Sequence, residues 1–558
     1  MKISPPLSLL WPPGIQPAHT DTTLDPQCVR DLELERTLAA LAARSPGRTT
    51  IRDILLNLCT DPAVIAYRQE ILADLWHHPD FTTRLEALLP DINALATYHA
   101  SLDRRRSPLH DVAWRLGELE QLVSCVSGLQ DLFTHLGDLL QAPGWRTLRD
   151  RIAQTAQDTV YQNLARELPA MLQTIRTNAS VTIGVNLDSR LRPVAATLLA
   201  VNAQKFTSSS FLDRLLGRRG NGFTGIGPLH TVPTLNLPRI TPGSQGEVNP
   251  LLIPLFHDLA QVLDTVCQPI ARTLGQYATV HSHWLAALGG DVAFYLAAVR
   301  LMERLRDRGL PLCRPEIAPM RERVCTLQAG YNLNLALQRL EHPEVKDLVV
   351  TNDVDMGERG RIGILTGPNQ GGKTTYTHMV GLCHILAQAG LWVPAARARI
   401  SPVDNIYTHY PVAEQLEKAT GRFGDEAQRL SHIFTRATCH SLILLNESLA
   451  STSPGESLYI AQDLVRILRR LGVRALFATH LHELAADVAT LNANTAGDSV
   501  IVSLVASRRT EGEDGTRRSF KIVPGQPLGR SYAQEIAVKY GISYEQLTTL
   551  LQKRGVLE

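Results

Sequence analysis

The chain has 558 residues, of which 44% are hydrophobic and 20% are charged, and these proportions are typical of a globular protein with a sizeable core. Its length is enough for about three or four domains. The net charge of +2 excludes a chain-wide basic surface for nucleic acid, so any such surface must be local.

The cysteines and the N-terminus bear on the compartment. The eight cysteines are scattered and none forms a C-x-x-C pair, so neither a zinc site nor a disulfide framework is indicated. Residues 1–13 contain one lysine and a short apolar stretch broken by prolines, which is not typical of a signal peptide. No run approaches the roughly 18 apolar residues of a membrane span. We therefore expect a cytoplasmic protein with reduced thiols and no membrane partner.

The N-terminal region is expected to be mainly helical. Residues 1–30 are rich in Pro, Thr and Asp, and we expect them to pack loosely. Short helical segments follow between residues 31 and 95. Thr60-Asp61-Pro62 is typical of a helix start, because a capping residue and an acid precede a proline in the first turn. We predict an N-terminal helical core over residues 1–100.

A β-rich insert between long helices is predicted next. Residues 109–178 have the pattern of two long amphipathic helices, and a helical pattern resumes beyond the insert. Residues 181–187 and 195–202 are β-branched and partly alternating, which predicts strands. A hairpin of long helices can carry a small domain far from its base. We therefore predict a lever over residues 101–310 with a clamp-like insert at about 180–248.

The most informative segment is a glycine-rich run between a predicted strand, residues 361–366, and a predicted helix, residues 375–390. It fits G-x-x-x-x-G-K-[ST], the pattern of a phosphate-binding loop, whose backbone N–H groups point at phosphate oxygens. Lys373 can reach the β- and γ-phosphates, and the Thr374 hydroxyl can ligate Mg²⁺. The alternative is a chance glycine-rich turn. The predicted nucleotide contacts are Gly367, Pro368, Asn369, Gln370, Gly371, Gly372, Lys373, Thr374 and Thr375.

Further polar groups follow two predicted strands. The apolar residues 442–445 predict a buried parallel strand that ends in Asn446 and Glu447. Ligands of such sheets bind beyond the carboxyl ends of the strands, so Asn446 would lie beside Mg²⁺ and Glu447 would face the attacking water. His480 follows the next strand and can sense the γ-phosphate through a hydrogen bond. A solvated acid and a structural histidine are the alternatives. Strands and helices alternate through residues 311–558, which predicts an α/β nucleotide-binding domain.

Several segments together resemble the MutS family, the mismatch-repair superfamily within the ABC-type ATPases. Their order and spacing match the family across roughly residues 315–545. The resemblance implies an ABC-type P-loop ATPase domain that binds ATP and Mg²⁺ and forms a homodimer. The segments are Thr366 to Tyr376, Val393 to Ala396, Phe423 to Glu426 with the helix 427–437, Ser441 to Glu447, Ala478 to Leu484 and Gly529 to Ala533.

The N-terminal half resembles the family more weakly. Asp61-Pro62 with Arg68-Gln69 is similar to the start of its helical core, and the helix–insert–helix order is similar to its lever and clamp. Its mismatch-reading and nuclease domains are not recognisable, so we expect a minimal MutS-like protein. The resemblance implies that the nucleotide cycle moves the lever and clamp. It also implies double-stranded or branched DNA as partner, in DNA repair or recombination.

Departures from the family pattern bear on activity. The family usually has Asp-Glu where this chain has Asn446-Glu447, and asparagine keeps an oxygen for Mg²⁺ but loses the negative charge. The family places a serine that contacts ATP across the dimer where this chain has Gly421, whose backbone N–H can still serve. Residues 448–453 lack the family's usual Gly-Arg-Gly, although hydroxyl side chains remain there. Slow hydrolysis would follow from these changes.

Basic residues form local groups. Arg214, Arg218 and Arg219 lie in the predicted insert, where the family's clamp touches DNA, and are candidate phosphate contacts. Arg104 to Arg106 form a second candidate. Four arginines beside a predicted hairpin turn at residues 511–515 are interpreted as solvated. A solvated loop is the alternative for the other two groups as well.

Three other functions would also use a phosphate-binding loop. A coiled-coil chromosome ATPase inserts a very long coiled coil between its nucleotide motifs, but only about 70 residues separate Lys373 from Asn446. A small-molecule P-loop kinase has no evident use for the Asn446-Glu447 pair and His480. A nucleotide-switched scaffold with negligible turnover, acting on ribosomes or proteins, stays open because of Asn446 and Gly421.

Overall fold

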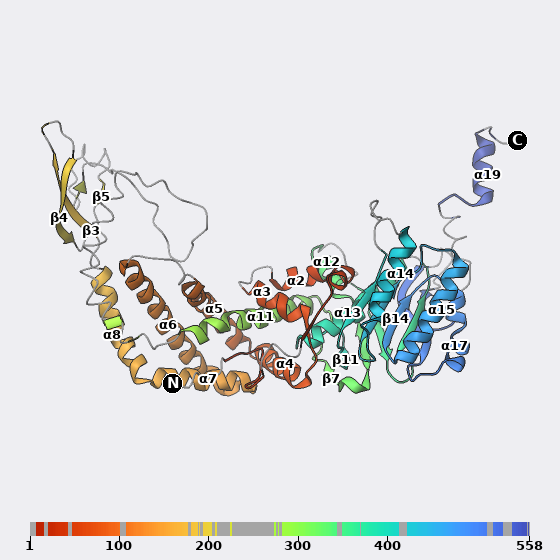
Figure 1. The fold of residues 1–558 in the computed structure, drawn as a ribbon, viewed down its shortest axis with the longest axis horizontal. Coiled ribbons are helices and arrows are strands. Elements are labelled where there is room, and N and C mark those ends of the chain that lie inside the picture. Colours follow the sequence, from red (N-terminus) through yellow and green to blue (C-terminus); the bar gives the residue numbers. More distant parts are fainter. Residues whose placement is uncertain are drawn as a thin grey trace. The chain divides into compact units, whose positions relative to one another are not determined.

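The chain divides into two compact units in the computed structural model (Figure 1). The first comprises Met1–Leu7, His78–Gln141 and Trp145–Gly289, and the second comprises Ser8–His77, Ala142–Gly144 and Gly290–Glu558. The domain limits predicted at residues 100 and 310 stay a prediction. The structure describes residues 7–15, 21–42, 47–100, 108–176, 180–187, 189, 193–202, 207–208, 224–225, 273–274, 277, 282–342, 349–368, 370–411, 421–509, 517–527, 538, 540–554 and 556.

Long helices build the first unit. Helices α5 and α6 approach closely because Gly128 leaves room for Leu88: a Cβ at Gly128 would stand 2.7 Å from Leu88 Cδ2. The prediction of only two helices over residues 109–178 is wrong, because Asp158 starts a further helix by accepting the Val160 N–H at 2.7 Å. The helices are α5 (Pro79–Ala100), α6 (Pro108–Leu136), the 3-10 helix η2 (Gly137–Leu139), α7 (Pro143–Gln157) and α8 (Thr159–Arg176).

A β-ribbon follows α8. Strands β3 (Ser180–Leu187) and β4 (Pro193–Asn202) pair antiparallel, with Ser180 opposite Asn202. Both lie where the alternating pattern predicted strands, so this prediction is confirmed. Two short parallel strands are also described, β5 (Thr207–Ser208) and β6 (Thr224–Gly225). The candidate DNA contacts lie outside the described residues: Arg104 to Arg106, Arg214, Arg218 and Arg219.

The N-terminal segment packs more tightly than its composition predicts. Leu9 and Leu10 are buried, and the Ser8 hydroxyl and the Leu9 N–H donate to the Asp291 carboxylate at 2.7 and 2.8 Å. Strand β1 (Asp21–Thr23) pairs with β2 (Asn57–Cys59). The expectation of loose packing is therefore wrong for the described part of residues 1–30, because a buried acid and a short sheet hold it.

Helices make up most of the second unit's N-terminal part. The predicted start at Thr60-Asp61-Pro62 is confirmed, because α4 begins at Pro62 and the Asp61 carboxylate accepts the Ala63 N–H at 2.8 Å. The helices are α1 (Pro26–Asp31), α2 (Leu34–Ala42), α3 (Arg48–Leu56), α4 (Pro62–His77) and α11 (His283–Arg306), the last beginning in the first unit.

Helix α11 is long and apolar enough to cross a membrane, and no other helix in the described part of the chain is. Its most apolar window has a mean hydropathy of 1.5, and 78% of that window is buried inside the structure. The core helix of a soluble protein passes the same test, so the finding is weak evidence for a span. Asp291 and Arg300 interrupt this helix, so it is not a continuous apolar run.

Two sheets organise the rest of the second unit. The larger has the order β12-β13-β14-β10-β15-β16, and all neighbours in it are parallel except β15 and β16. The smaller has the order β7-β11-β8-β9. The strands of the larger sheet are β10 (Ile362–Thr366), β12 (Ile406–His409), β13 (Leu442–Asn446), β14 (Arg474–Ala478), β15 (Ile501–Arg509) and β16 (Arg517–Pro524); those of the smaller are β7 (Glu316–Ile317), β8 (Cys325–Gly330), β9 (Asn352–Met356) and β11 (Arg397–Ile400).

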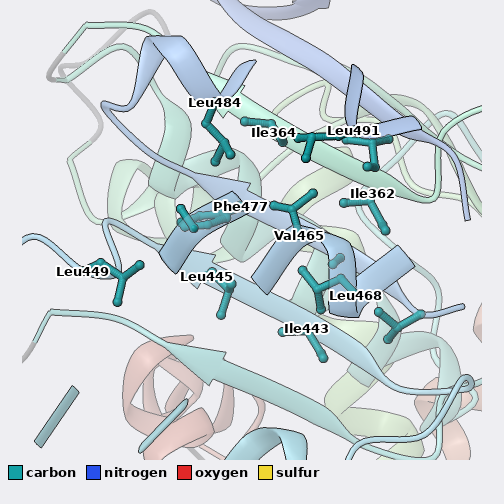
Figure 2. Packing of buried hydrophobic residues seen from close by; sticks show 14 of the residues in the cluster. Ile362, Ile364, Ile443, Leu445, Leu449, Val465, Leu468, Phe477, Leu484 and Leu491 are labelled. Carbon is teal, nitrogen blue, oxygen red and sulfur yellow. The ribbon is translucent and has the colours of Figure 1, made fainter. Parts of the chain in front are cut away.

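Helices cover both faces of the larger sheet. On one face, Ile443, Leu445 and Phe477 are fully buried against Val465 and Leu468 (Figure 2). On the other face α13 approaches so closely that a Cβ at Gly381 would stand 3.1 Å from Leu444. The remaining helices of this unit are α12 (Leu333–Leu340), α13 (Lys373–Gln388), α14 (Gly421–Phe434), α15 (Pro454–Leu471), α16 (His482–Ala486), α17 (Val488–Asn494) and α19 (Tyr544–Lys553).

A buried arginine joins the two sheets. Arg474, the first residue of β14, is completely buried. Its guanidinium donates to the carbonyl oxygens of Val324, Ser401 and Pro402 at 2.9, 2.8 and 3.0 Å. Burial lowers the pKa of Arg474 to about 10. Three buried carbonyls are thereby satisfied by one side chain, which fixes the ends of β8 and β11 against β14.

Candidate active site

The segment between β10 and α13 is a tight loop that depends on glycine. Gly367 and Gly372 have φ of +141° and +94°, a region that favours glycine, and Gln370 has a φ of +60°. A Cβ at Gly367 would stand 2.7 Å from Ala506 Cβ. The Gly371 N–H donates to Pro368 O at 3.1 Å and closes a turn. Among the predicted contacts, Asn369 lies outside the described residues.

Lys373 is the first residue of α13, and its side chain lies against this loop. Its side chain is only 4% exposed, and Nζ donates to the carbonyl oxygens of Gly367 and Pro368 at 3.0 and 3.1 Å. Burial lowers the pKa of Lys373, and the nearby Glu447 carboxylate acts against that change. A buried ammonium with only neutral acceptors favours an anion that can approach it.

Thr374 and Asn446 meet across the sheet edge. The Thr374 hydroxyl donates to Asn446 Oδ1 at 3.2 Å, and Asn446 is the last residue of β13. Both supply uncharged oxygens, the hard donors that Mg²⁺ accepts in proteins, so this pair fits the metal. The described residues contain no group of three or more His, Cys, Asp and Glu side chains that could hold a metal. Water and phosphate would therefore have to complete the coordination.

Glu447 and His480 form a polar pair beside this oxygen pair. Glu447 Oε1 lies 3.2 Å from His480 Nε2, and their side chains are 36% and 44% exposed. The hydrogen bond from His480 holds the pKa of Glu447 below its usual range, with help from the charge of Lys373 and against the effect of burial. Glu447 has a φ of +50°, which strains a non-glycine residue and is often found at functional sites.

The topology brings the predicted side chains to one edge. Parallel pairing places Asn446 opposite Ala478 and Leu365 opposite the same residue, so β10, β13 and β14 end together. The Glu447 N–H donates to Ala478 O at 2.8 Å. The structure thus gathers the loop around Lys373, the Thr374–Asn446 pair and the Glu447–His480 pair. Gly421 is the first residue of α14.

The turn after Glu447 contains partners that the sequence analysis did not identify. The Ser448 hydroxyl lies 2.7 Å from His409 Nδ1, and the Ser451 hydroxyl donates to Glu426 Oε2 at 2.8 Å. His409 ends β12, so it is a polar residue at the carboxyl end of a parallel strand, the same signal that singled out Asn446. This pattern could have identified His409 as a candidate site residue, but it could not predict the contact with Ser448, which is 39 residues away in the sequence.

Family models match two parts of the chain. Residues 363–538 match the model described as MutS domain V, which includes the loop, both polar pairs and α14. Residues 60–308 match the model described as the MutS2 N-terminal domain. The two matches follow one another along the chain and together cover most of it.

Individual relatives are also MutS and MutS2 proteins, and they align with between 38% and 84% of the chain. A DNA mismatch repair protein MutS from Caldanaerobacter subterraneus is 33% identical over 38% of this chain and 24% of the relative. An endonuclease MutS2 from Thermus thermophilus is 33% identical over 40% of this chain and 29% of the relative. A MutS from Granulibacter bethesdensis is 28% identical over 84% of this chain and 51% of the relative. The chain thus spans between about a quarter and a half of these relatives.

Proposed function

Since this chain belongs to the MutS family, we propose that it is a DNA-binding ATPase built on an ABC-type phosphate-binding loop. The observation that carries the proposal is the gathering of Lys373, the Thr374–Asn446 pair and the Glu447–His480 pair at one edge of a parallel sheet. Ligands of parallel sheets bind at this edge. The three groups are those that binding and hydrolysing a nucleoside triphosphate require.

ATP binds with its phosphates against the loop from Gly367 to Gly372. Lys373 exchanges its bonds to two loop carbonyls for bonds to phosphate oxygens, which are stronger because both partners are charged. The Thr374 hydroxyl and the Asn446 oxygen would hold Mg²⁺, which would neutralise phosphate charge. Asparagine contributes no negative charge, so we expect weaker metal binding than an aspartate would give.

Glu447 receives the water that attacks the γ-phosphate. Its lowered pKa keeps the carboxylate ionised at neutral pH, and His480 fixes its direction. A strongly ionised carboxylate is a weak base, so Glu447 acts mainly by orienting the water. Phosphoryl transfer passes through a loose transition state in which positioning matters more than proton removal. Hydrolysis therefore depends on the position of Glu447, and it is slow because Asn446 binds the metal weakly.

The working form is a homodimer in the cytoplasm. The N–H groups at the start of α14, at Gly421, complete the site of the other subunit, since the first N–H groups of a helix favour anions. Nucleotide binding and hydrolysis move the lever helices, and the insert closes on double-stranded or branched DNA in repair or recombination. Arg214, Arg218 and Arg219 contact its phosphates. The cysteines of the described residues are free thiols, which suits a reducing compartment.

Asn446 supports a second candidate function. If Mg²⁺ binds too weakly for turnover, the same site becomes a nucleotide-controlled switch, and the partner is then a ribosome or another protein. Such a chain would retain ATP almost stoichiometrically without steady release of phosphate. Both functions need Lys373 for nucleotide binding, and only the first needs Glu447 for turnover.

Steady-state ATP turnover of the wild type and of Lys373→Ala tests the proposal, with no DNA and with plain, mismatched or branched duplex. We expect turnover that vanishes in the variant and rises with one DNA form. Lys373-dependent turnover that ignores every DNA would overturn the DNA part. Tight ATP binding without turnover would favour the switch. No ATP binding by the wild type would reject both functions.

A further inference from the structure

The turn that carries Glu447 is held in an unfavourable backbone conformation. Glu447 and Leu449 have φ of +50° and +69°, a left-handed region that is unfavourable for a non-glycine residue. Ser448 lies between them and is 4% exposed. Strained positions on both sides of one residue persist only when neighbouring groups hold the turn.

Contacts made by Leu449 and by Ser448 hold this turn. The Leu449 carbonyl accepts the Ser457 hydroxyl at 2.7 Å, and the Leu449 side chain packs in the core cluster of the sheet. The Ser448 hydroxyl lies 2.7 Å from His409 Nδ1 and donates to the His409 carbonyl at 3.3 Å. The contacts of Leu449 fix the far end of the turn, and those of Ser448 fix the residue next to Glu447.

His409 is itself firmly placed. It ends β12, where its backbone pairs with Leu445 of the strand that leads to Glu447. Its side chain is 1% exposed, and burial lowers the pKa of His409 to about 4, so the ring is neutral at pH 7. The next residue is held as well, because both terminal nitrogens of Arg429 donate to Tyr410 O at 3.1 Å. The imidazole is therefore a rigid support and Ser448 the group that it holds.

We propose that His409 is a positioning residue for Glu447, acting through the Ser448 hydroxyl. The proposal rests on the proposed function, in which Glu447 orients the attacking water. Loss of the Ser448–His409 hydrogen bond lets the strained turn relax toward ordinary φ values, and the Glu447 carboxylate then rotates away from the water. The phosphate loop lies on another segment. Asn446 is next to Glu447, but its pairing with Ala478 holds it in β13. Both therefore keep their geometry, and ATP still binds.

Four variants test this proposal in the full-length protein. Ser448→Ala and His409→Leu remove the hydrogen bond from either side. His409→Asn keeps a polar atom near the position of Nδ1, and an amide can donate or accept, so it restores the bond for either ring tautomer. Ser441→Ala is the matched control: Ser441 is also buried and donates at 2.7 Å, to Asp404, but at the opposite end of β13.

We expect Ser448→Ala and His409→Leu to lower kcat for ATP at least tenfold, since small misplacements of a catalytic group have large effects on rate. The dissociation constant for ATP should stay within twofold of the wild type. His409→Asn should recover most of kcat, and Ser441→Ala should leave it unchanged. The double variant Ser448→Ala with His409→Leu should be no slower than Ser448→Ala alone, because Ser448→Ala already removes every hydrogen bond between the hydroxyl and His409.

Glu447→Gln separates this proposal from the function on which it rests. If Glu447→Gln keeps normal turnover, the assignment of Glu447 fails and the positioning role fails with it. If Glu447→Gln abolishes turnover while Ser448→Ala and His409→Leu turn over like the wild type, only the positioning role is overturned. It is also overturned if His409→Asn is as slow as His409→Leu, or if ATP binding falls in parallel with kcat.

Discussion

The two ends of the same parallel strands use polar residues in different ways. At the amino ends, Arg474 and Ser441 are completely buried, and they bond to carbonyls or carboxylates that the fold holds in place. At the carboxyl ends, Glu447 and His480 bond to each other and remain a third or more exposed. Polar groups satisfied by the fold stabilise it, whereas partly exposed pairs on strained backbone stay available for a ligand.

Glu447→Gln should have the largest effect at the carboxyl end. The amide cannot accept the water's hydrogen bonds as a carboxylate does, so we expect kcat for ATP to fall about 100-fold or more. ATP affinity and melting temperature should stay close to those of the wild type, because the side chain is partly exposed. Phosphate release measures the loss of turnover, equilibrium binding measures ATP affinity, and thermal unfolding measures the melting temperature. A large loss of stability would contradict the contrast between the two ends.

Arg474→Met should have the opposite profile at the amino end. It leaves the carbonyls of Val324, Ser401 and Pro402 without their donor, and each unsatisfied buried group costs about 1–3 kcal/mol. We expect the free energy of unfolding to fall by roughly 3–5 kcal/mol, measured by urea denaturation. Turnover per folded molecule should be nearly unchanged.

The control for Arg474→Met is Arg466→Met, which breaks an exposed i,i+3 pair with Asp463 on α15. Exposed pairs of this kind contribute roughly 0–1 kcal/mol. If the two variants unfold at the same urea concentration, the buried arginine does not stabilise the junction of the sheets.

The pH dependence should report on the Glu447–His480 pair. His480→Asn weakens the interaction that lowers the pKa of Glu447, so this pKa should rise toward its usual value near 4.5. Glu447 acts as a carboxylate, so activity is lost as pH falls through its pKa. Because this pKa is higher in the variant, the acid limb of the kcat/KM profile should move to higher pH. An unshifted limb would mean that another group controls it.

Local signals predicted the parts of the site well. The predicted strands at residues 361–366 and 442–445 are β10 and β13 to within a residue, because apolar runs end in glycine or polar residues there. The predicted turn at residues 511–515 lies outside the described residues, but the strands on either side of it pair antiparallel, with Arg509 opposite Arg517. Such patterns depend on a few neighbouring residues, so they can be recognised without the fold.

Contacts between distant segments could not be predicted in this way. Arg474 stands at the start of a strand, where a charge usually faces water, but it is buried against carbonyls beside the smaller sheet and against His384 of α13. His409 meets Ser448 because β12 pairs with β13, and that pairing joins strands more than 30 residues apart. The sequence supplied the residue types in both cases, but strand order and register decided what they contact.

The smallest expected effect is that of Asn446→Asp on metal dependence. Aspartate keeps an acceptor for the Thr374 hydroxyl and adds a negative charge for Mg²⁺, so half-maximal turnover should need several-fold less Mg²⁺. Without metal, the new charge beside Glu447 repels that carboxylate, and stability should fall slightly. A Mg²⁺ titration of turnover in the wild type, Asn446→Asp and Thr374→Val measures this, with Thr374→Val expected to need more metal. If Asn446→Asp leaves the Mg²⁺ requirement unchanged, Asn446 does not hold the metal, and the carboxyl end of β13 serves the ligand only through Glu447.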